Sequence, residues 1–154
     1  MTPAICVASK AGIAFTVHEF AHDQSHDSYG LEAAAKLNVP ADRIFKTLIV
    51  DVGSVLAVGI IPVTAMLNMK SMARVLGAKK AAMADKADVE RSTGYVLGGV
   101  SPLGQKKQLR TIIDVAALGH PTIFVSAGRR GLEIELCPHD LERITGAEFA
   151  DIRQ

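Results

Sequence analysis

The chain of 154 residues has no tryptophan, two tyrosines, five phenylalanines and two cysteines. With so few aromatic side chains, a core has to be built from alanine, valine, isoleucine, leucine and methionine. Cys6 and Cys137 show no disulfide framework and no metal-ligand spacing, so we expect small buried residues in a reducing cytosol. No apolar run approaches the roughly 20 residues of a membrane span, and no signal-peptide core is present, which predicts a cytoplasmic protein without a membrane partner.

An excess of charge of one sign is also missing, because 17 Lys and Arg face 16 Asp and Glu. No global field argues for nucleic acid, although a local patch stays open. The candidate patches are Lys79–Lys80, Lys106–Lys107 with Arg110, and Arg129–Arg130. Short pairs of this kind are usually solvated faces. The composition is that of a globular chain, and its length suits a single domain over residues 1–154 without repeats or linkers.

Hydrophobic patterning and capping residues predict an α/β domain of the α+β kind. Helices are expected at residues 4–10, 29–37, 69–76, 86–92 and 138–145. Strands are expected at residues 13–20, 43–50, 55–63, 81–84, 109–114, 122–126, 132–136 and, in the tail, 147–153. Helices and strands do not alternate regularly, and several consecutive strands are joined by tight turns. We therefore predict a mixed, largely antiparallel sheet, partly barrel-like, flanked by helices.

Lys46 is the most informative residue of the predicted strands. Side chains alternate along a strand, so Lys46 shares a face with the aliphatic residues Ile44, Leu48 and Val50. An ammonium in this row needs a carboxylate, several acceptors or a pocket with an electron-rich ligand, because burying it alone is costly. The alternative is a strand lysine whose amine extends to solvent. The strand pattern by itself leaves both open.

The turn region at residues 98–104, GGVSPLG, has neither Walker nor dinucleotide-binding spacing. Its exposed backbone N–H groups can bind a carbonyl oxygen or oxyanion, although a plain turn would look the same in sequence. Ser126, at the end of a strand, either donates to a ligand or supports the next turn. In the strand 132–136 the apolar residues form the core face, which leaves Glu133 and Glu135 opposite. We expect two solvated carboxylates, or one that pairs with Lys46.

Two kinds of catalytic site receive no support from the residues. His18, His22 and His26 recur every four residues, which on a helix would form a metal-binding face. Because His18 falls in a predicted strand and the other two in a predicted loop, we predict no metal site. No nucleophile–base pair stands out, and Gly-x-Ser-x-Gly is missing. An enzyme with this sequence would depend on positioning, on backbone donors and on a reactive group of the substrate.

Taken together, several segments resemble one family, the YbaK/EbsC proteins. The matching segments are residues 1–5, 45–48, 83–86, 92–107 and 146–152, so the resemblance covers essentially the whole chain. The most specific block is GGVSPLGQKK at residues 98–107. The family consists of bacterial Cys-tRNA(Pro) deacylases related to the editing domain of prolyl-tRNA synthetase, and the resemblance implies that fold and activity for this chain.

The family's activity corrects an error of prolyl-tRNA synthetase, which mischarges tRNA(Pro) with cysteine because cysteine is close to proline in size. The resemblance implies that this chain hydrolyses the wrong ester in trans, and that the substrate thiol attacks the ester carbonyl to give a cyclic thiolactone. It implies tRNA(Pro) and prolyl-tRNA synthetase as partners, no cofactor, and a monomer or weak homodimer.

The resemblance also assigns residues. Lys46 matches the family's essential lysine, which holds the substrate or the tRNA terminus and does not form a Schiff base. The expected substrate-binding residues are Phe20, Tyr29, Gly98, Gly99, Ser101, Ser126 and Glu133.

Three of these positions depart from the family pattern: Phe20 replaces a tyrosine, Tyr29 replaces a phenylalanine, and Glu133 stands where relatives can carry aspartate. These three departures concern the lining of the pocket, so the resemblance predicts the pocket lining less directly than the class of activity. Two alternatives remain, namely an Ala-tRNA(Pro) deacylase of the same superfamily and a module that binds a tRNA end, nucleotide or small anion without turnover.

Overall fold

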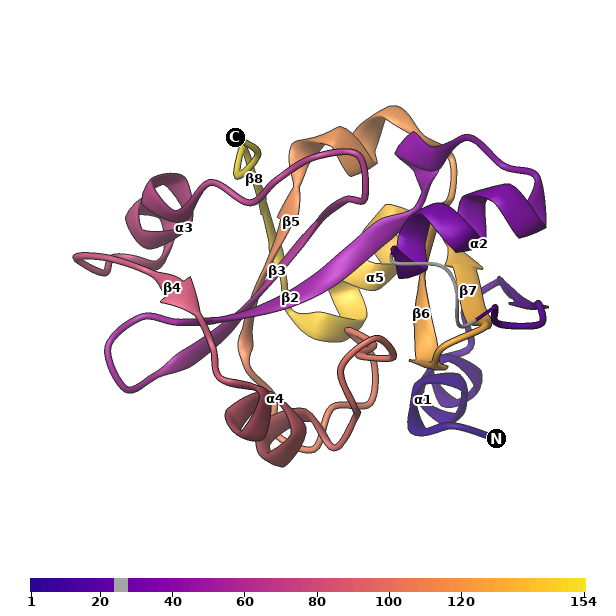
Figure 1. The fold of residues 1–154 in the computed structure, drawn as a ribbon, viewed down its shortest axis with the longest axis horizontal. Helices are drawn as coiled ribbons and strands as arrows, with labels where there is room; N and C mark the ends of the chain where they lie inside the picture. Colours follow the sequence, from indigo (N-terminus) through magenta and orange to yellow (C-terminus); the bar gives the residue numbers. More distant parts are fainter. Residues whose placement is uncertain (24–27) are drawn as a thin grey trace.

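The computed structural model describes residues 1–23 and 28–154 and has an α+β architecture (Figure 1). The helices are α1 (Pro3–Ala11), α2 (Tyr29–Leu37), α3 (Met69–Leu76), α4 (Lys86–Thr93) and α5 (Pro138–Thr145), with short 3-10 helices η1 (Ala41–Arg43) and η2 (Val115–Gly119). The strands are β1 (Phe15–Glu19), β2 (Phe45–Asp51), β3 (Leu56–Pro62), β4 (Ala82–Met83), β5 (Arg110–Asp114), β6 (Ile123–Arg129), β7 (Leu132–Leu136) and β8 (Glu148–Ala150). Within these residues no helix is long and apolar enough to cross a membrane.

The strands form two sheets. The order is β1-β7-β6 in the three-stranded sheet and β4-β2-β3-β5-β8 in the five-stranded sheet. All pairings of the smaller sheet are antiparallel, as are β2–β3 and β2–β4, whereas β3–β5 and β5–β8 are parallel. A parallel bridge between Ile44 and Phe124 joins the sheets at the start of β2. The predicted mixed, largely antiparallel arrangement is confirmed.

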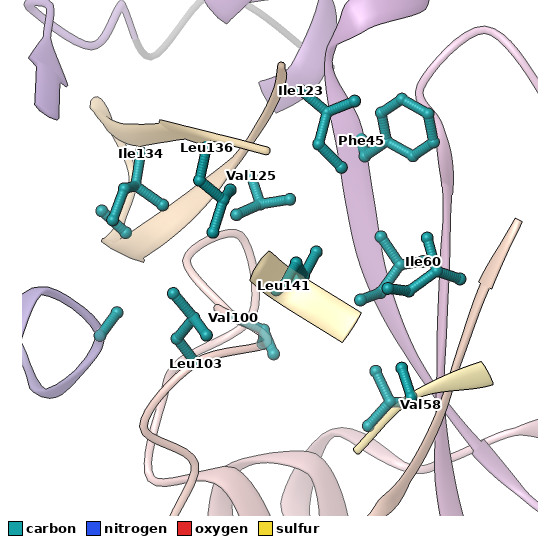
Figure 2. Close-up of a cluster of buried hydrophobic side chains, with 14 of the residues drawn as sticks. Phe45, Val58, Ile60, Val100, Leu103, Ile123, Val125, Ile134, Leu136 and Leu141 are labelled. Atoms are coloured by element: carbon teal, nitrogen blue, oxygen red, sulfur yellow. The ribbon is translucent and has the colours of Figure 1, made fainter. Parts of the chain in front are cut away.

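The main core lies between the two sheets and is closed by helix α5 and by the glycine-rich region. Phe45 and Ile60 from the larger sheet and Ile134 from the smaller one are at most 2% exposed. Leu141 of α5 lies among them and is 0% exposed (Figure 2). This core contains one phenylalanine and one tyrosine among its buried members and is otherwise aliphatic, as the composition requires. Burial of these side chains is the main force that holds the sheets together.

Local signals in the sequence explain where the elements begin and end. Helix α2 and strand β7 have the predicted bounds, and so does α5, which starts at Pro138. Helix α3 starts after Asn68, whose side chain accepts from Ser71 N, and ends at Gly77, whose φ of 71° suits glycine. The predicted tail strand is shorter than expected, because only Glu148–Ala150 pairs with β5. The predicted loop at residues 21–28 lies partly outside the described residues.

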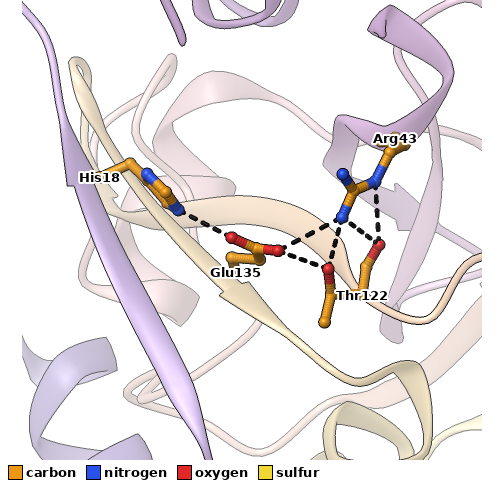
Figure 3. A network of polar contacts seen from close by, with 4 residues as sticks. All are labelled: His18, Arg43, Thr122 and Glu135. Atoms are coloured by element: carbon orange, nitrogen blue, oxygen red, sulfur yellow. Dashed lines mark hydrogen bonds and ion pairs between the residues drawn. The ribbon is translucent and has the colours of Figure 1, made fainter. Parts of the chain in front are cut away.

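A polar network connects the two sheets next to the bridge (Figure 3). Glu135 of β7 accepts from Thr122 Oγ1 at 2.5 Å and lies 3.3 Å from Arg43 Nη2 and 2.9 Å from His18 Nε2. Arg43 ends η1, two residues before the first residue of β2, and its guanidinium also lies over the ring of Phe124. The network therefore holds Arg43, three residues before Lys46, against the smaller sheet.

Candidate functional site

A pocket of about 520 Å³ opens between β2 and the smaller sheet. Its walls come from β2 and the residue before it, from the start of α2, from the loop after α4, from the residue that follows β3, and from one residue each of β6 and β7. The lining residues are Ser28, Tyr29, Gly30, Ile44, Phe45, Lys46, Thr47, Leu48, Val63, Leu97, Gly98, Val100, Ser126 and Glu133. This volume lies within the range of pockets that hold small-molecule ligands, roughly 300–1,000 Å³.

Strand β2 faces this pocket with an edge that lacks a neighbouring strand. It pairs with β3 over its full length but with β4 only at Val50 and Asp51. Val63 N donates to Ile44 O on the β3 side, and Ala84 N donates to Ile49 O on the other side. Because peptide groups alternate along an antiparallel strand, those of Thr47 point away from β3. The backbone N–H and C=O groups of Thr47 are thus available to a ligand at the pocket wall.

Lys46 lies in this pocket wall and is half-buried. It has no hydrogen bond or ion pair with any residue in the described part of the chain. Burial lowers the pKa of its ammonium group below the ordinary lysine value. Of the two sequence-based alternatives, the structure therefore supports a lysine that faces a pocket, and no carboxylate of residues 1–23 and 28–154 pairs with it.

The expectation that Glu133 and Glu135 are solvated is wrong. Glu133 lines the pocket, is 8% exposed and has no hydrogen-bond partner among residues 1–23 and 28–154. Burial raises the pKa of its carboxyl group to about 8. Glu135 instead belongs to the network of Figure 3, where the hydrogen bond from Thr122 and the neighbouring His18 and Arg43 lower its pKa. The face of β7 that carries both residues is covered by the start of β2, which the strand pattern does not show.

The glycine-rich region approaches the pocket through its backbone. Gly98 lines the pocket with φ of +93°, a conformation that residues with a Cβ rarely adopt. A Cβ on Gly98 would lie 2.6 Å from Cζ of Tyr29, and a Cβ on Gly99 would lie 2.8 Å from Cα of Arg129. Gly99 N donates to Val96 O at 3.0 Å. The two glycines are required because the loop lies against α2 on one side and the β6–β7 turn on the other.

Ser126 and Tyr29 also line the pocket, whereas three of the expected residues do not. Ser126 Oγ accepts from Gly128 N at 3.2 Å, so the hydroxyl supports the turn while lining the pocket. Gly99 lies beside the pocket-lining Gly98. Ser101 is 0% exposed, and its Oγ accepts from Leu103 N at 3.2 Å. Phe20 packs in a separate apolar cluster against α2.

Two of the three regularly spaced histidines pair with carboxylates. His18 pairs with Glu135, and His22 Nδ1 lies 2.8 Å from Glu32. His26 lies outside the described residues. Among the residues that the structure does describe, no group of three or more His, Cys, Asp or Glu is arranged to hold a metal ion.

Thr47 is the most informative of the pocket residues that the sequence did not point to. Thr47 lines the pocket, and its Oγ1 is buried without a hydrogen-bond partner in the described part of the molecule. A buried hydroxyl without a partner costs free energy, so it is a signal of a ligand contact or of local strain. Side chains alternate along β2, so Thr47 and Lys46 point to opposite faces of the strand. Both nevertheless line the pocket, because the pocket wall includes the edge of β2 that β4 does not cover.

The pocket therefore combines a cation, a carboxylic acid and exposed backbone groups. At neutral pH Glu133 is mainly protonated, because its pKa is about 8, and it can donate a hydrogen bond. Lys46 can bind an anionic or electron-rich group. Among residues 1–23 and 28–154, the lining includes hydroxyls but neither histidine nor cysteine. These described residues can bind and orient a ligand, and they offer no paired nucleophile and base.

Comparison with known proteins relates this chain to proteins named for tRNA deacylation and aminoacylation. A protein from Enterococcus faecalis named "Putative Cys-tRNA(Pro)/Cys-tRNA(Cys) deacylase EbsC" is 38% identical over 154 residues, which cover 98% of this chain and 92% of that protein. A proline–tRNA ligase of Lactobacillus helveticus is 31% identical over 124 residues, which are 80% of this chain and 22% of the ligase.

Solved structures share the whole fold. The crystal structure of "a putative trans-editing enzyme for prolyl tRNA synthetase" superposes with a TM-score of 0.86 at 23% identity, covering 100% of this chain and 99% of the other. A crystal structure of a hypothetical protein superposes with a TM-score of 0.87 at 27% identity, covering 99% and 100%. The model of the aminoacyl-tRNA editing domain matches residues 26–144. The chain therefore belongs to the aminoacyl-tRNA editing domain family, within its YbaK/EbsC group.

Proposed function

We propose that this protein is a trans-editing aminoacyl-tRNA deacylase that clears Cys-tRNA(Pro). Membership of the editing family supports the deacylase activity, and the similarity to EbsC supports cysteine as the amino acid. The observation that carries the proposal is the pocket itself. Within the described part of the chain, it holds a lysine without an ion-pair partner and a protonatable glutamate, and its lining has no cysteine or histidine as a nucleophile or base.

The missing nucleophile is explained if the substrate supplies one. In this mechanism the thiolate sulfur of the cysteinyl group attacks its own ester carbonyl, and a C–S bond forms. The bond between the carbonyl carbon and the ribose oxygen breaks, and that oxygen takes a proton as the tRNA leaves. The resulting cyclic thiolactone is then opened by water to give cysteine. The enzyme contributes the bound conformation that brings sulfur and carbonyl together.

The pocket residues suit this task in distinct ways. Lys46 binds the terminal ribose or phosphate oxygens as a fixed cation. The Gly98 backbone contacts the carbonyl oxygen on which negative charge develops. Glu133, as a neutral acid, donates a hydrogen bond to the bound substrate. Ser126 and Tyr29 complete the wall.

The partner is the acceptor end of mischarged tRNA(Pro), delivered with the help of prolyl-tRNA synthetase. The near balance of 17 basic and 16 acidic residues predicts weak binding of free tRNA that falls as salt rises. Specificity for tRNA(Pro) then comes from the synthetase, whose own editing domain is related to this chain in sequence.

The decisive experiment measures release of the amino acid from Cys-tRNA(Pro), Ala-tRNA(Pro) and Ser-tRNA(Pro). The wild-type protein should release cysteine, and Lys46→Ala should abolish the release with an unchanged circular dichroism spectrum. Lys10→Ala is the matched control, because Lys10 is exposed in α1, outside the pocket lining. Preferred release of alanine would identify an Ala-tRNA(Pro) deacylase. Binding of tRNA without any release would identify a binding module.

A further inference from the structure

Helix α2 carries a carboxylate that is completely buried at the side of the pocket. Glu32 is 0% exposed and lies 2.8 Å from His22 Nδ1 and 2.7 Å from the backbone nitrogen of Asp23. Lys36 Nζ lies 3.3 Å from Oε2, and Arg130 Nε lies 3.7 Å from Oε1. Burial alone would raise the pKa of Glu32, but hydrogen bonds from Asp23, His22 and Lys36 outweigh it and lower the pKa to about 2. Glu32 is thus a charged hub that joins α2, the segment after β1, and the β6–β7 turn.

Arg130 connects this hub to the pocket wall. Its guanidinium carbon lies 3.5 Å from the centroid of the Tyr29 ring, which is the distance of a close stacking contact. Tyr29 is the first residue of α2 and lines the pocket. An ion pair at 3.7 Å, longer than a hydrogen bond, therefore connects Glu32 to the guanidinium that covers one face of a pocket-lining ring.

The other face of the ring is covered by Gly98. A Cβ on Gly98 would lie 2.6 Å from Cζ of Tyr29 and 3.0 Å from each of the two Cε atoms. These distances place that point above the ring plane and not beyond the hydroxyl. No atom of Arg130 is among the three nearest to that point, although the guanidinium lies close to the same ring. Arg130 and Gly98 consequently lie on opposite faces of Tyr29.

From this arrangement we infer that Glu32 is a positioning residue of the pocket, which acts through Arg130 and the clamped ring of Tyr29 to hold the backbone of Gly98 in place. The inference rests on the proposed function for its effect on deacylation. The contact of Gly99 with the backbone of Arg129 reinforces the same connection, because the glycine loop then rests on both the turn and the ring. Glu32 is outside the pocket lining and does not touch the substrate.

The expected effect on kcat follows from how precisely the backbone of Gly98 must be positioned for the reaction. Glu32→Gln removes the charge that holds Arg130 and directs an amide N–H₂ group towards basic neighbours. A displacement of about 1 Å in a catalytic group lowers rates by up to ~100-fold. We therefore expect kcat to fall about ten- to a hundredfold and KM to change little, since Lys46 and most of the lining are untouched.

The matched control is a second buried carboxylate with a purely structural setting. Asp114 is 0% exposed, accepts from Ile152 N and Ala116 N at 2.9 Å each, and pairs with Arg153 at 2.9 Å. It lies outside the pocket lining. Asp114→Asn should lower thermal stability and leave kcat within about twofold of wild type. All variants are assayed well below their unfolding temperatures.

Four further variants separate positioning from stability. Tyr29→Phe keeps the ring, so it should lower kcat much less than Tyr29→Leu does. Tyr29→Leu removes the clamped ring and should lower kcat as far as Glu32→Gln. The double variant Glu32→Gln/Tyr29→Leu should be no slower than either single variant, because both remove the same connection. Arg130→Lys keeps the charge but loses the planar stack, and should resemble Tyr29→Leu.

A structural readout makes the test independent of the deacylase activity. In protein labelled with ¹⁵N-glycine, the amide signal of Gly98 should shift in Glu32→Gln and in Tyr29→Leu and stay in place in Asp114→Asn. An unchanged Gly98 signal in Glu32→Gln would overturn the inference, as would additive losses in the double variant. If the wild-type protein releases no amino acid, the proposed function fails, and the Gly98 signal alone decides on the positioning role.

Discussion

Replacement of Glu133 by glutamine should make the protein more stable at alkaline pH and leave its stability nearly unchanged near pH 4.5. Glu133 is 8% exposed, and burial raises its pKa from 4.5 to about 8. Between these two pH values the folded protein binds a proton that the unfolded chain has lost. The unfolding free energy of the wild type therefore falls as pH rises through this window. Glutamine carries no proton to lose and removes this dependence.

The magnitude follows from the shift in pKa. One pKa unit corresponds to about 1.4 kcal/mol, so the shift from 4.5 to about 8 corresponds to about 5 kcal/mol as an upper limit. Urea unfolding of both proteins between pH 4.5 and pH 9, followed by circular dichroism, measures the difference at each pH. The advantage of Glu133→Gln should increase steadily and level off above pH 8.

Glu135→Gln is the control, because it lies on the same strand and its pKa is lowered instead of raised. The hydrogen bond from Thr122 and the ion pairs of Glu135 stabilise the protein above the ordinary carboxyl pKa, and that contribution is lost as pH falls through the lowered value. Glu135→Gln should thus be destabilising throughout the range from pH 5 to pH 9, with little slope. A constant difference between wild type and Glu133→Gln over that range would refute a buried, proton-binding Glu133.

Two further substitutions probe the pocket wall. Gly98→Ala places a Cβ 2.6 Å from Tyr29 at a φ of +93°. We therefore expect the free energy of unfolding in denaturant to fall by about 1–2 kcal/mol and the rate of deacylation to fall more than about tenfold. Full activity would show that the loop does not contact the reacting group. Thr47→Val removes a buried hydroxyl without a described partner, so urea unfolding should show about 1 kcal/mol more stability. A loss of stability would mean that the hydroxyl is hydrogen-bonded in solution.

Much of the fold could be predicted because its signals are local. Ser28 and Asn68 cap α2 and α3 through side-chain oxygens, and Gly77 and Gly146 end α3 and α5 with positive φ. These capping residues act within one helical turn, so the helix ends can be recognised from the sequence. The apolar alternation of residues 132–136 likewise marked β7 with its observed bounds.

The environment of the polar residues could not be predicted in the same way. Glu133 and Glu135 follow the same alternation, yet one is buried without a described partner and the other is in an ion-pair network. The difference arises because the residues packed over β7 come from distant parts of the chain. Thr47 was missed for a related reason, since its exposure to the pocket depends on the absence of a strand beside β2. The hub at Glu32 depends on Arg130, 98 positions away in the sequence.

The most direct test of the central claim compares the rates at which the wild-type protein releases cysteine, serine and alanine from tRNA(Pro). Serine differs from cysteine only by an oxygen in place of sulfur, and alanine lacks either group. Because the lining residues that the structure describes include no cysteine or histidine to act in place of the substrate thiol, cysteine should be released at least about tenfold faster than serine or alanine. Equal rates for the three amino acids, or faster release of alanine, would contradict an editing reaction driven by the substrate thiol.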